Sequence, residues 1–496
     1  MKGEKNLKPR PNVILIVMDT VRADHLSSYG YYRKTTPNID KMARRGVLYE
    51  NAFTAAPWTP PSHASIFTGK YPSHHKTIGK DVRFKKENTS LAEILSRNGY
   101  QSIGVTCCQL LGLESGFEEG FDEFIELKPS SLLSFKLDKL YYKDSIRNLI
   151  YGPDKGTYQA TEFIKNFLKR NYTKKRPFFL FVNYFNSHTP YDPPRPFKKR
   201  FYGGFDESRF HIKEILLNKV RRTAEKISDH NLDIRRLRWI ASGGGGFAFA
   251  AKKTSVSEKE WEVVKSWYDG EVAYLDYHIG NLVDFLYEKD IFDDTFFIIT
   301  SDHGENFGEH GLAVHPLCVY DSLLRVPLIM SNPDLTPKGK TISNLVSTVD
   351  IFPTIMDLLD IKFDEKINGK SLYPFEDREI HNFICAEYGG LHTRGFRGLK
   401  SWKIASKIKD ILGEIDKGCK CIRTLTYKYI LSLQKEELYN IRDDPFEQED
   451  ISRKSPEIVD SLKRQLENTV DISYYGPKEF KETQEMLDRL KALGYI

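Results

Sequence analysis

Pro11-Asn-Val-Ile-Leu-Ile-Val-Met-Asp-Thr20 is the stretch that decides the fold. An unbroken apolar run of this length is typical of a strand buried on both faces of a parallel sheet, and it ends at Asp19. A second apolar run, Phe296–Thr300, leads to Asp302 and His303. Ligands of open α/β sheets gather beyond the carboxyl ends of the strands. We therefore expect the two acidic strand ends to meet in one crevice.

The rest of the chain alternates between strand and helix patterns. Further strand-like runs cover 178–185 and 326–330, and helical patterns cover 90–98, 159–168 and 258–286. This alternation predicts an α/β fold with a large, mainly parallel sheet flanked by helices.

The organisation predicted from these patterns has an N-terminal tail at 1–10, a catalytic domain at 11–375 and a smaller α+β subdomain at 376–496. The subdomain is expected to end in a helix carrying Leu487, Leu490 and Leu493. Within the catalytic domain, 127–257 has basic helical stretches and a glycine-rich run at 242–250. Such an insert is expected to shape substrate access, with a disordered loop as the alternative.

A second informative stretch is Trp58-Thr-Pro-Pro-Ser-His-Ala-Ser-Ile-Phe-Thr-Gly-Lys70. It places the Thr59 hydroxyl at a proline-rich turn, and we expect Ser62 to cap the helix that follows. A threonine hydroxyl needs an activator before it can act as a nucleophile. Asp19, Asp302, His303 and the Thr59 oxygen together predict a divalent-metal site, because coordination lowers the pKa of a bound oxygen.

These segments resemble the sulfatase branch of the alkaline phosphatase superfamily. The resemblance extends in the family's order over most of the chain, through Tyr31–Asp40, Thr68–Pro72, Tyr268–Asp276, Tyr320–Leu328, Ser347–Thr354 and Glu437–Pro445. It implies an alkaline phosphatase-like fold and hydrolysis of an anionic ester.

The departures from the family pattern concern the reacting groups. Thr59 stands where sulfatases oxidise Cys or Ser to formylglycine, and His63 replaces their Arg. Oxidation of threonine would give a ketone, so no formylglycine is expected. Asp19-Thr20 replaces a tandem acidic pair, and Asp302-His303 replaces Asp-Asn. The added imidazole favours Mn²⁺ or Zn²⁺ over Ca²⁺ or Mg²⁺.

The donor set of Asp, Thr, Asp and His is similar to that of the phosphodiesterases and the phosphoethanolamine and lipoteichoic-acid transferases of the superfamily. The leading interpretation is a metal-dependent hydrolase of sulfate or phosphate esters with Thr59 as nucleophile. A phosphoryl-alcohol transferase and a catalytically inactive binding protein on this fold are the alternatives.

The resemblance also implies substrate-binding residues. Lys70 and His75 follow the nucleophile turn, His188 ends the strand at 178–185, and His315 lies near the family's substrate lysine. A two-metal variant would recruit Asp192 together with His188 and His315, although the order of Asp192 and His188 is reversed from the phosphodiesterase pattern.

Composition fits a large enzyme of 496 residues that is 40% hydrophobic. Its 74 basic and 68 acidic residues give a net charge of +6, which suits an anionic substrate and requires no nucleic acid. No stretch approaches the roughly 20 apolar residues of a membrane span, and the N-terminus has no apolar signal region. A cytoplasmic protein is therefore expected, with export by an unrecognised route as the alternative. The six cysteines agree with a reducing compartment.

Overall fold

The computed structural model describes residues 10–79, 82–127, 154–202, 233–242, 254–315, 318–390, 418–432 and 435–474, with the single residues 246, 249, 250 and 252. Much of the predicted insert at 127–257 lies outside the described residues, as does the predicted helix with Leu487, Leu490 and Leu493. Within the described part, no helix combines the length and apolar character that crossing a bilayer requires.

The described residues form a central eight-stranded sheet in the order β10-β2-β9-β6-β1-β5-β3-β4. Its strands are β1 (Asn12–Met18), β2 (Val47–Phe53), β3 (Gln101–Thr106), β4 (Glu123–Glu126), β5 (Phe178–Tyr184), β6 (Thr295–Ser301), β9 (Leu328–Ser331) and β10 (Lys340–Ser347). β9 runs antiparallel to both of its neighbours, whereas the other paired strands of this sheet are parallel. The α/β fold with a mainly parallel sheet is confirmed.

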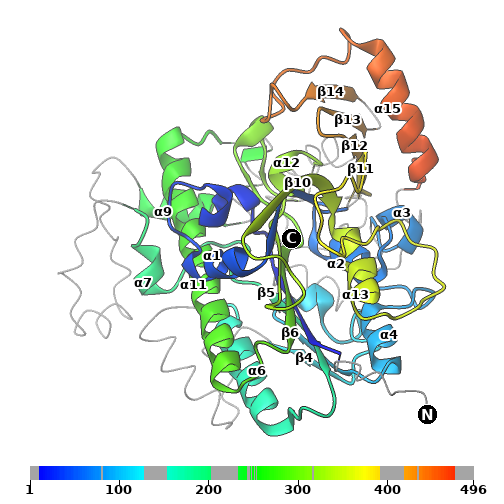
Figure 1. Cartoon of the computed structure of the whole chain (residues 1–496). Helices are drawn as coiled ribbons and strands as arrows, with labels where there is room; N and C mark the ends of the chain where they lie inside the picture. Colours follow the sequence, from blue (N-terminus) through cyan, green and yellow to red (C-terminus); the bar gives the residue numbers. More distant parts are fainter. Residues whose placement is uncertain are drawn as a thin grey trace.

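Helices cover both faces of this sheet (Figure 1). One group is α1 (Pro37–Arg45), α6 (Thr157–Asn171) and α11 (Glu258–Glu288), and the other is α2 (Thr59–Thr68), α4 (Leu91–Arg97) and α13 (Ile351–Leu358). Every residue of β1, β5 and β6 is buried, as expected for strands that are covered on both sides. The long α11 begins with a capping box between Ser257 and Glu260.

A smaller antiparallel sheet follows, in the order β11-β12-β13-β14. Its strands are β11 (Ile384–Tyr388), β12 (Cys419–Arg423), β13 (Tyr427–Ser432) and β14 (Glu436–Asn440), and α15 (Pro456–Thr469) packs on it. The six cysteines of the chain are buried free thiols. This sheet and helix fit the predicted α+β subdomain, while its boundary at 375/376 stays a prediction.

Helix α2 begins earlier than the sequence suggested. We expected Ser62 to cap it, but the helix starts at Thr59, with Trp58 as the N-terminal flanking residue. Pro60 and Pro61 fit this first turn because its amide groups have no partners inside the helix. Ser62 is therefore inside the helix, where its hydroxyl donates to the Asp302 carbonyl at 2.7 Å.

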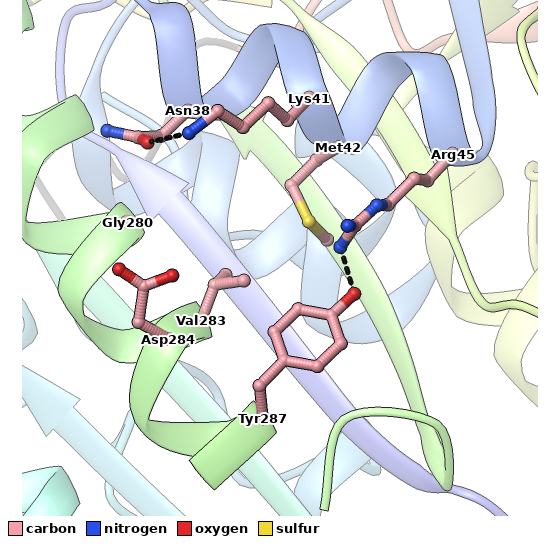
Figure 2. A pocket seen from close by; sticks show the side chains of 8 residues that line it. All are labelled: Asn38, Lys41, Met42, Arg45, Gly280, Val283, Asp284 and Tyr287. Carbon is pink, nitrogen blue, oxygen red and sulfur yellow. Dashed lines mark hydrogen bonds between the residues drawn. The ribbon is translucent and has the colours of Figure 1, made fainter.

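A surface groove of about 400 Å³ separates α1 from α11 (Figure 2). Lys41 and Arg45 line one side, and Asp284 and Tyr287 line the other, with Arg45 hydrogen-bonded to Tyr287. None of its lining residues belongs to the predicted site.

Asp276 of α11 acts as an N-cap for α1 from a distance. Its carboxylate accepts the amide hydrogens of Asn38 at 3.0 Å and Ile39 at 2.8 Å. We expect Asp276→Ala to lower the free energy of unfolding by about 2 kcal/mol, because two helix amides lose their buried acceptor. Urea denaturation checks this. The matched control is Asp284→Ala on the same helix, where the side chain is exposed and the change should be within about 0.5 kcal/mol.

Candidate metal and nucleophile site

Two neighbouring strands deliver the acidic residues of the site. β1 and β6 pair in parallel up to Met18 and Ser301, so Asp19 and Asp302 leave the same edge of the sheet. One ligand atom each from Asp19, Asp302 and His303 lies within 4.8 Å of the other two, and all three side chains are buried. The predicted meeting of the strand ends is present in the structure.

Thr59, at the start of helix α2, lies next to this cluster. Its Oγ1 lies 3.5 Å from Asp19 Oδ2 and 3.4 Å from His303 Nε2. As the first residue of α2, it lies beside the amide groups of the helix N-terminus, which favour negative charge. The helix start thus places a hydroxyl among potential metal ligands.

The two carboxyl groups leave acceptors unsatisfied. Asp19 Oδ1 and Asp302 Oδ2 are buried without a hydrogen-bond partner among the described residues. Such groups are costly unless something compensates them. Burial and the neighbouring Asp302 raise the pKa of Asp19 well above its usual value. A divalent cation would satisfy both oxygens and remove the repulsion, so the residues fit a metal ion.

The tautomer of His303 also suits coordination of a metal ion. Its Nδ1 lies 2.8 Å from the Gly304 carbonyl, which can only accept, so Nδ1 carries the proton. The lone pair is then on Nε2, the atom nearest Thr59. Burial lowers the pKa of His303 to about 4 against the opposing effect of Asp302. The imidazole is neutral at pH 7, as a metal ligand must be.

Supporting residues that the sequence analysis missed hold the carboxylates in place. Thr20 has a left-handed backbone with φ 58°, and its amide donates to Asp302 Oδ1 at 3.1 Å. Asn183, near the end of β5, donates to Asp19 Oδ2 at 3.4 Å. The position of Asn183 at a strand end beside β1 was a signal that could have identified it.

His63, which replaces the family's Arg, is also part of the surroundings of the site. It is fully buried one turn after Thr59 in α2. Its Nδ1 donates to the Thr59 carbonyl at 2.8 Å and lies 3.7 Å from Asp302 Oδ2. The residue that replaces the family's Arg therefore contacts the backbone of the candidate nucleophile.

His188 and His315 lie beside the cluster. The ring of His315 is 4.4 Å from that of His303 and 5.0 Å from that of His188, measured between ring centroids. Glu305, another residue the sequence analysis missed, is 3.0 Å from His315 Nδ1 through its Oε1. Burial and His315 lower the pKa of His188 well below its usual value. The imidazoles of His315 and His188 thus lie next to His303 on one side of the metal candidates.

The other predicted residues make contacts elsewhere. Lys70 Nζ donates to Asn88 Oδ1 at 3.1 Å, and His75 Nε2 lies 3.0 Å from the Ser65 hydroxyl. Asp192, the extra residue of the two-metal variant, pairs with Lys198 at 2.5 Å. The structure brings none of these three into contact with Asp19, Thr59, Asp302 or His303 among the interactions of the described residues.

The sulfatase family model matches residues 11–361 of the chain. The chain belongs to the sulfatase family. It is 27% identical over 399 residues to an arylsulfatase of Clostridium perfringens, covering 73% of this chain and 78% of that protein. It is 25% identical over 484 residues to human arylsulfatase K, covering 93% of this chain and 82% of that protein.

Among solved structures, the phosphonate monoester hydrolase of Agrobacterium radiobacter has a TM-score of 0.68 at 20% identity, covering 93% of this chain and 95% of that one. This likeness supports the alkaline phosphatase-like fold. Membership of the sulfatase family makes the protein a hydrolase of ester bonds, from a family that generally uses a divalent metal ion.

Proposed function

We propose that the protein is a metal-dependent hydrolase of sulfate or phosphate esters with Thr59 as its nucleophile, and that phosphorus is the preferred centre. The observation that carries this proposal is the Thr59 hydroxyl, 3.5 Å from an Asp19 oxygen and 3.4 Å from His303 Nε2 at the start of a helix.

Asp19, Thr59, Asp302 and His303 would hold the metal ion. Three oxygen donors and one imidazole suit Mn²⁺ or Zn²⁺ better than Ca²⁺, which prefers an all-oxygen shell. When bound, such an ion would lower the pKa of the threonine hydroxyl.

Thr59 itself supports the preference for phosphorus. Attack by its Oγ1 on the central atom of the ester expels the alcohol and leaves an ester on Thr59. A hydrated formylglycine can expel sulfate by using its second hydroxyl, but threonine has no second hydroxyl. A water molecule must therefore attack the central atom again, and phosphorus tolerates such in-line displacement well.

His188 and His315 are the proposed contacts for the remaining oxygens of the substrate. The Thr189 carbonyl lies 2.8 Å from His188 Nδ1, and Glu305 lies 3.0 Å from His315 Nδ1. Both partners fix a proton on Nδ1 and orient the rings. Lys70 and His75 stay predicted substrate contacts, with less support because each makes its contacts with other residues.

A panel of aryl substrates tests the proposed function. Protein loaded with Mn²⁺ or Zn²⁺ is assayed against an aryl sulfate, an aryl phosphate and an aryl phosphodiester, with and without glycerol as an alcohol acceptor. We expect a phosphate ester to have the highest kcat/KM, and water to outcompete glycerol. A preference for the sulfate ester over both phosphate esters would refute the preference for phosphorus. Predominant transfer to glycerol would instead support a transferase.

A further inference from the structure

The loop that carries His303 is anchored on a short helix, α12 (Asp321–Leu324). The Gly304 amide donates to the Leu323 carbonyl at 2.7 Å, and the Glu305 amide donates to the Ser322 carbonyl at 3.2 Å. A Cβ atom on Gly304 would lie 2.1 Å from the Ser322 oxygen. The two backbones thus approach so closely that only glycine fits.

A side-chain contact extends this anchor. The Ser322 hydroxyl donates to Asn306 Oδ1 at 2.6 Å, and Asn306 Nδ2 donates to the Val314 carbonyl at 3.0 Å. Gly304, Glu305 and Asn306 therefore each form a hydrogen bond with α12. The position of α12 thus determines the position of the loop that carries His303.

Helix α12 is in turn attached to the C-terminal sheet by a buried group of charges. Asp321 pairs with Lys428 of β13 at 2.6 Å and with Arg423 of β12 at 3.0 Å. Glu447 pairs with Lys428 at 2.6 Å and accepts the Asp321 amide at 2.8 Å. The Lys428 side chain is fully buried. A buried charge that loses its partner strongly destabilises the fold. The Lys428 charge therefore holds Asp321 and Glu447 in their observed positions.

We propose that Lys428 and Asp321 are positioning residues through which the C-terminal sheet holds the His303 loop in its metal-binding geometry. The proposal rests on the proposed function for the role of His303. It assigns the small sheet a part in assembling the site, although the sheet contributes no metal ligand in the proposed site.

Two measurements on the full-length protein test this role. The first is amide hydrogen exchange of residues 303–306 in metal-free protein, and the second is the Kd for Mn²⁺ and Zn²⁺ by calorimetry. We expect Lys428→Met to speed exchange at Gly304 and Glu305 by about 10-fold, because their acceptors on α12 shift. We expect its Kd per folded molecule to rise by about 10- to 100-fold. Lys428→Arg should recover most of both effects.

The matched control is Lys420→Met. Lys420 is also a fully buried lysine of the same sheet and pairs with Glu387 at 2.7 Å, on the side of α3 (Pro72–His75) and away from α12. It should lose stability without changing exchange at 303–306 or metal affinity.

If Lys428→Met does not fold, the same two measurements are made on Asp321→Asn, for which we expect the same changes. Unchanged exchange at 303–306 in the folded variant, or an equal change in Lys420→Met, overturns the proposal. A wild-type protein that binds neither ion contradicts the metal dependence of the proposed function, while the exchange comparison still decides the positioning role.

Discussion

Thr59→Ala is expected to lower kcat by about 10³-fold or more while leaving KM within about threefold, because the variant still binds substrate but lacks the attacking oxygen. Thr59→Ser keeps the hydroxyl and should retain part of the activity. Steady-state kinetics on the best substrate of the aryl panel measures both. Intact-mass spectrometry of a quenched reaction should show an adduct on the peptide that contains Thr59.

The control for this experiment is Thr68→Ala in the same helix. Thr68 is equally buried, and its hydroxyl donates to the Ala64 carbonyl at 2.6 Å and accepts the Lys70 amide hydrogen at 3.3 Å, without contacting the metal candidates. Its loss should cost stability but not turnover. Coexpression with a formylglycine-generating enzyme should leave wild-type activity unchanged. Full activity in Thr59→Ala would exclude the threonine mechanism.

Asp302→Ala is expected to remove the metal ion, with the Kd for Mn²⁺ or Zn²⁺ rising by at least about 100-fold. Loss of an outer-sphere partner alone typically weakens metal binding 10- to 100-fold, and a direct ligand should matter more. The metal-free variant should stay folded, because the substitution also removes repulsion between two buried carboxyl groups. Elemental analysis after gel filtration gives the metal content, and circular dichroism reports the fold.

Asp276→Ala serves as the comparison, since it also deletes a buried carboxylate but one that holds a helix end. It should lower stability and keep the wild-type metal content. Wild-type protein that purifies without metal and keeps its activity in the presence of chelators would be incompatible with the proposed site.

Local sequence predicted the parts of the fold and site that depend on local patterns. Continuous apolar runs predicted β1, β5 and β6. The polar residues that follow β1 and β6 predicted the cluster of Asp19, Asp302 and His303. Parallel strands of one sheet end at one edge, so two distant acidic residues could be assigned to one site without coordinates. Family membership then confirmed the resemblance that the ordered motifs along the chain had suggested.

Other features depend on contacts that no local pattern encodes. The apolar run at 326–330 predicts a strand, but its composition does not reveal that β9 runs antiparallel to its neighbours. His63 is buried because α2 as a whole is buried by its tertiary contacts. Asp321 and Lys428 are 107 residues apart in sequence, and each alone resembles an ordinary surface charge. Such long-range pairings appear only when the chain is folded.

The wide sequence separation within the candidate site also bears on how the protein acquires its metal. The Thr20 amide donates to Asp302, 282 residues later in the sequence, and Asp19 and Asp302 follow strands that are direct neighbours in the sheet. Contacts between residues so far apart in sequence form late, because the entropy of closing a long loop must be overcome first. A ribosome must therefore have synthesised the chain beyond His303 before a complete donor set exists. Metal loading by the complete donor set should accordingly not begin before that point of synthesis.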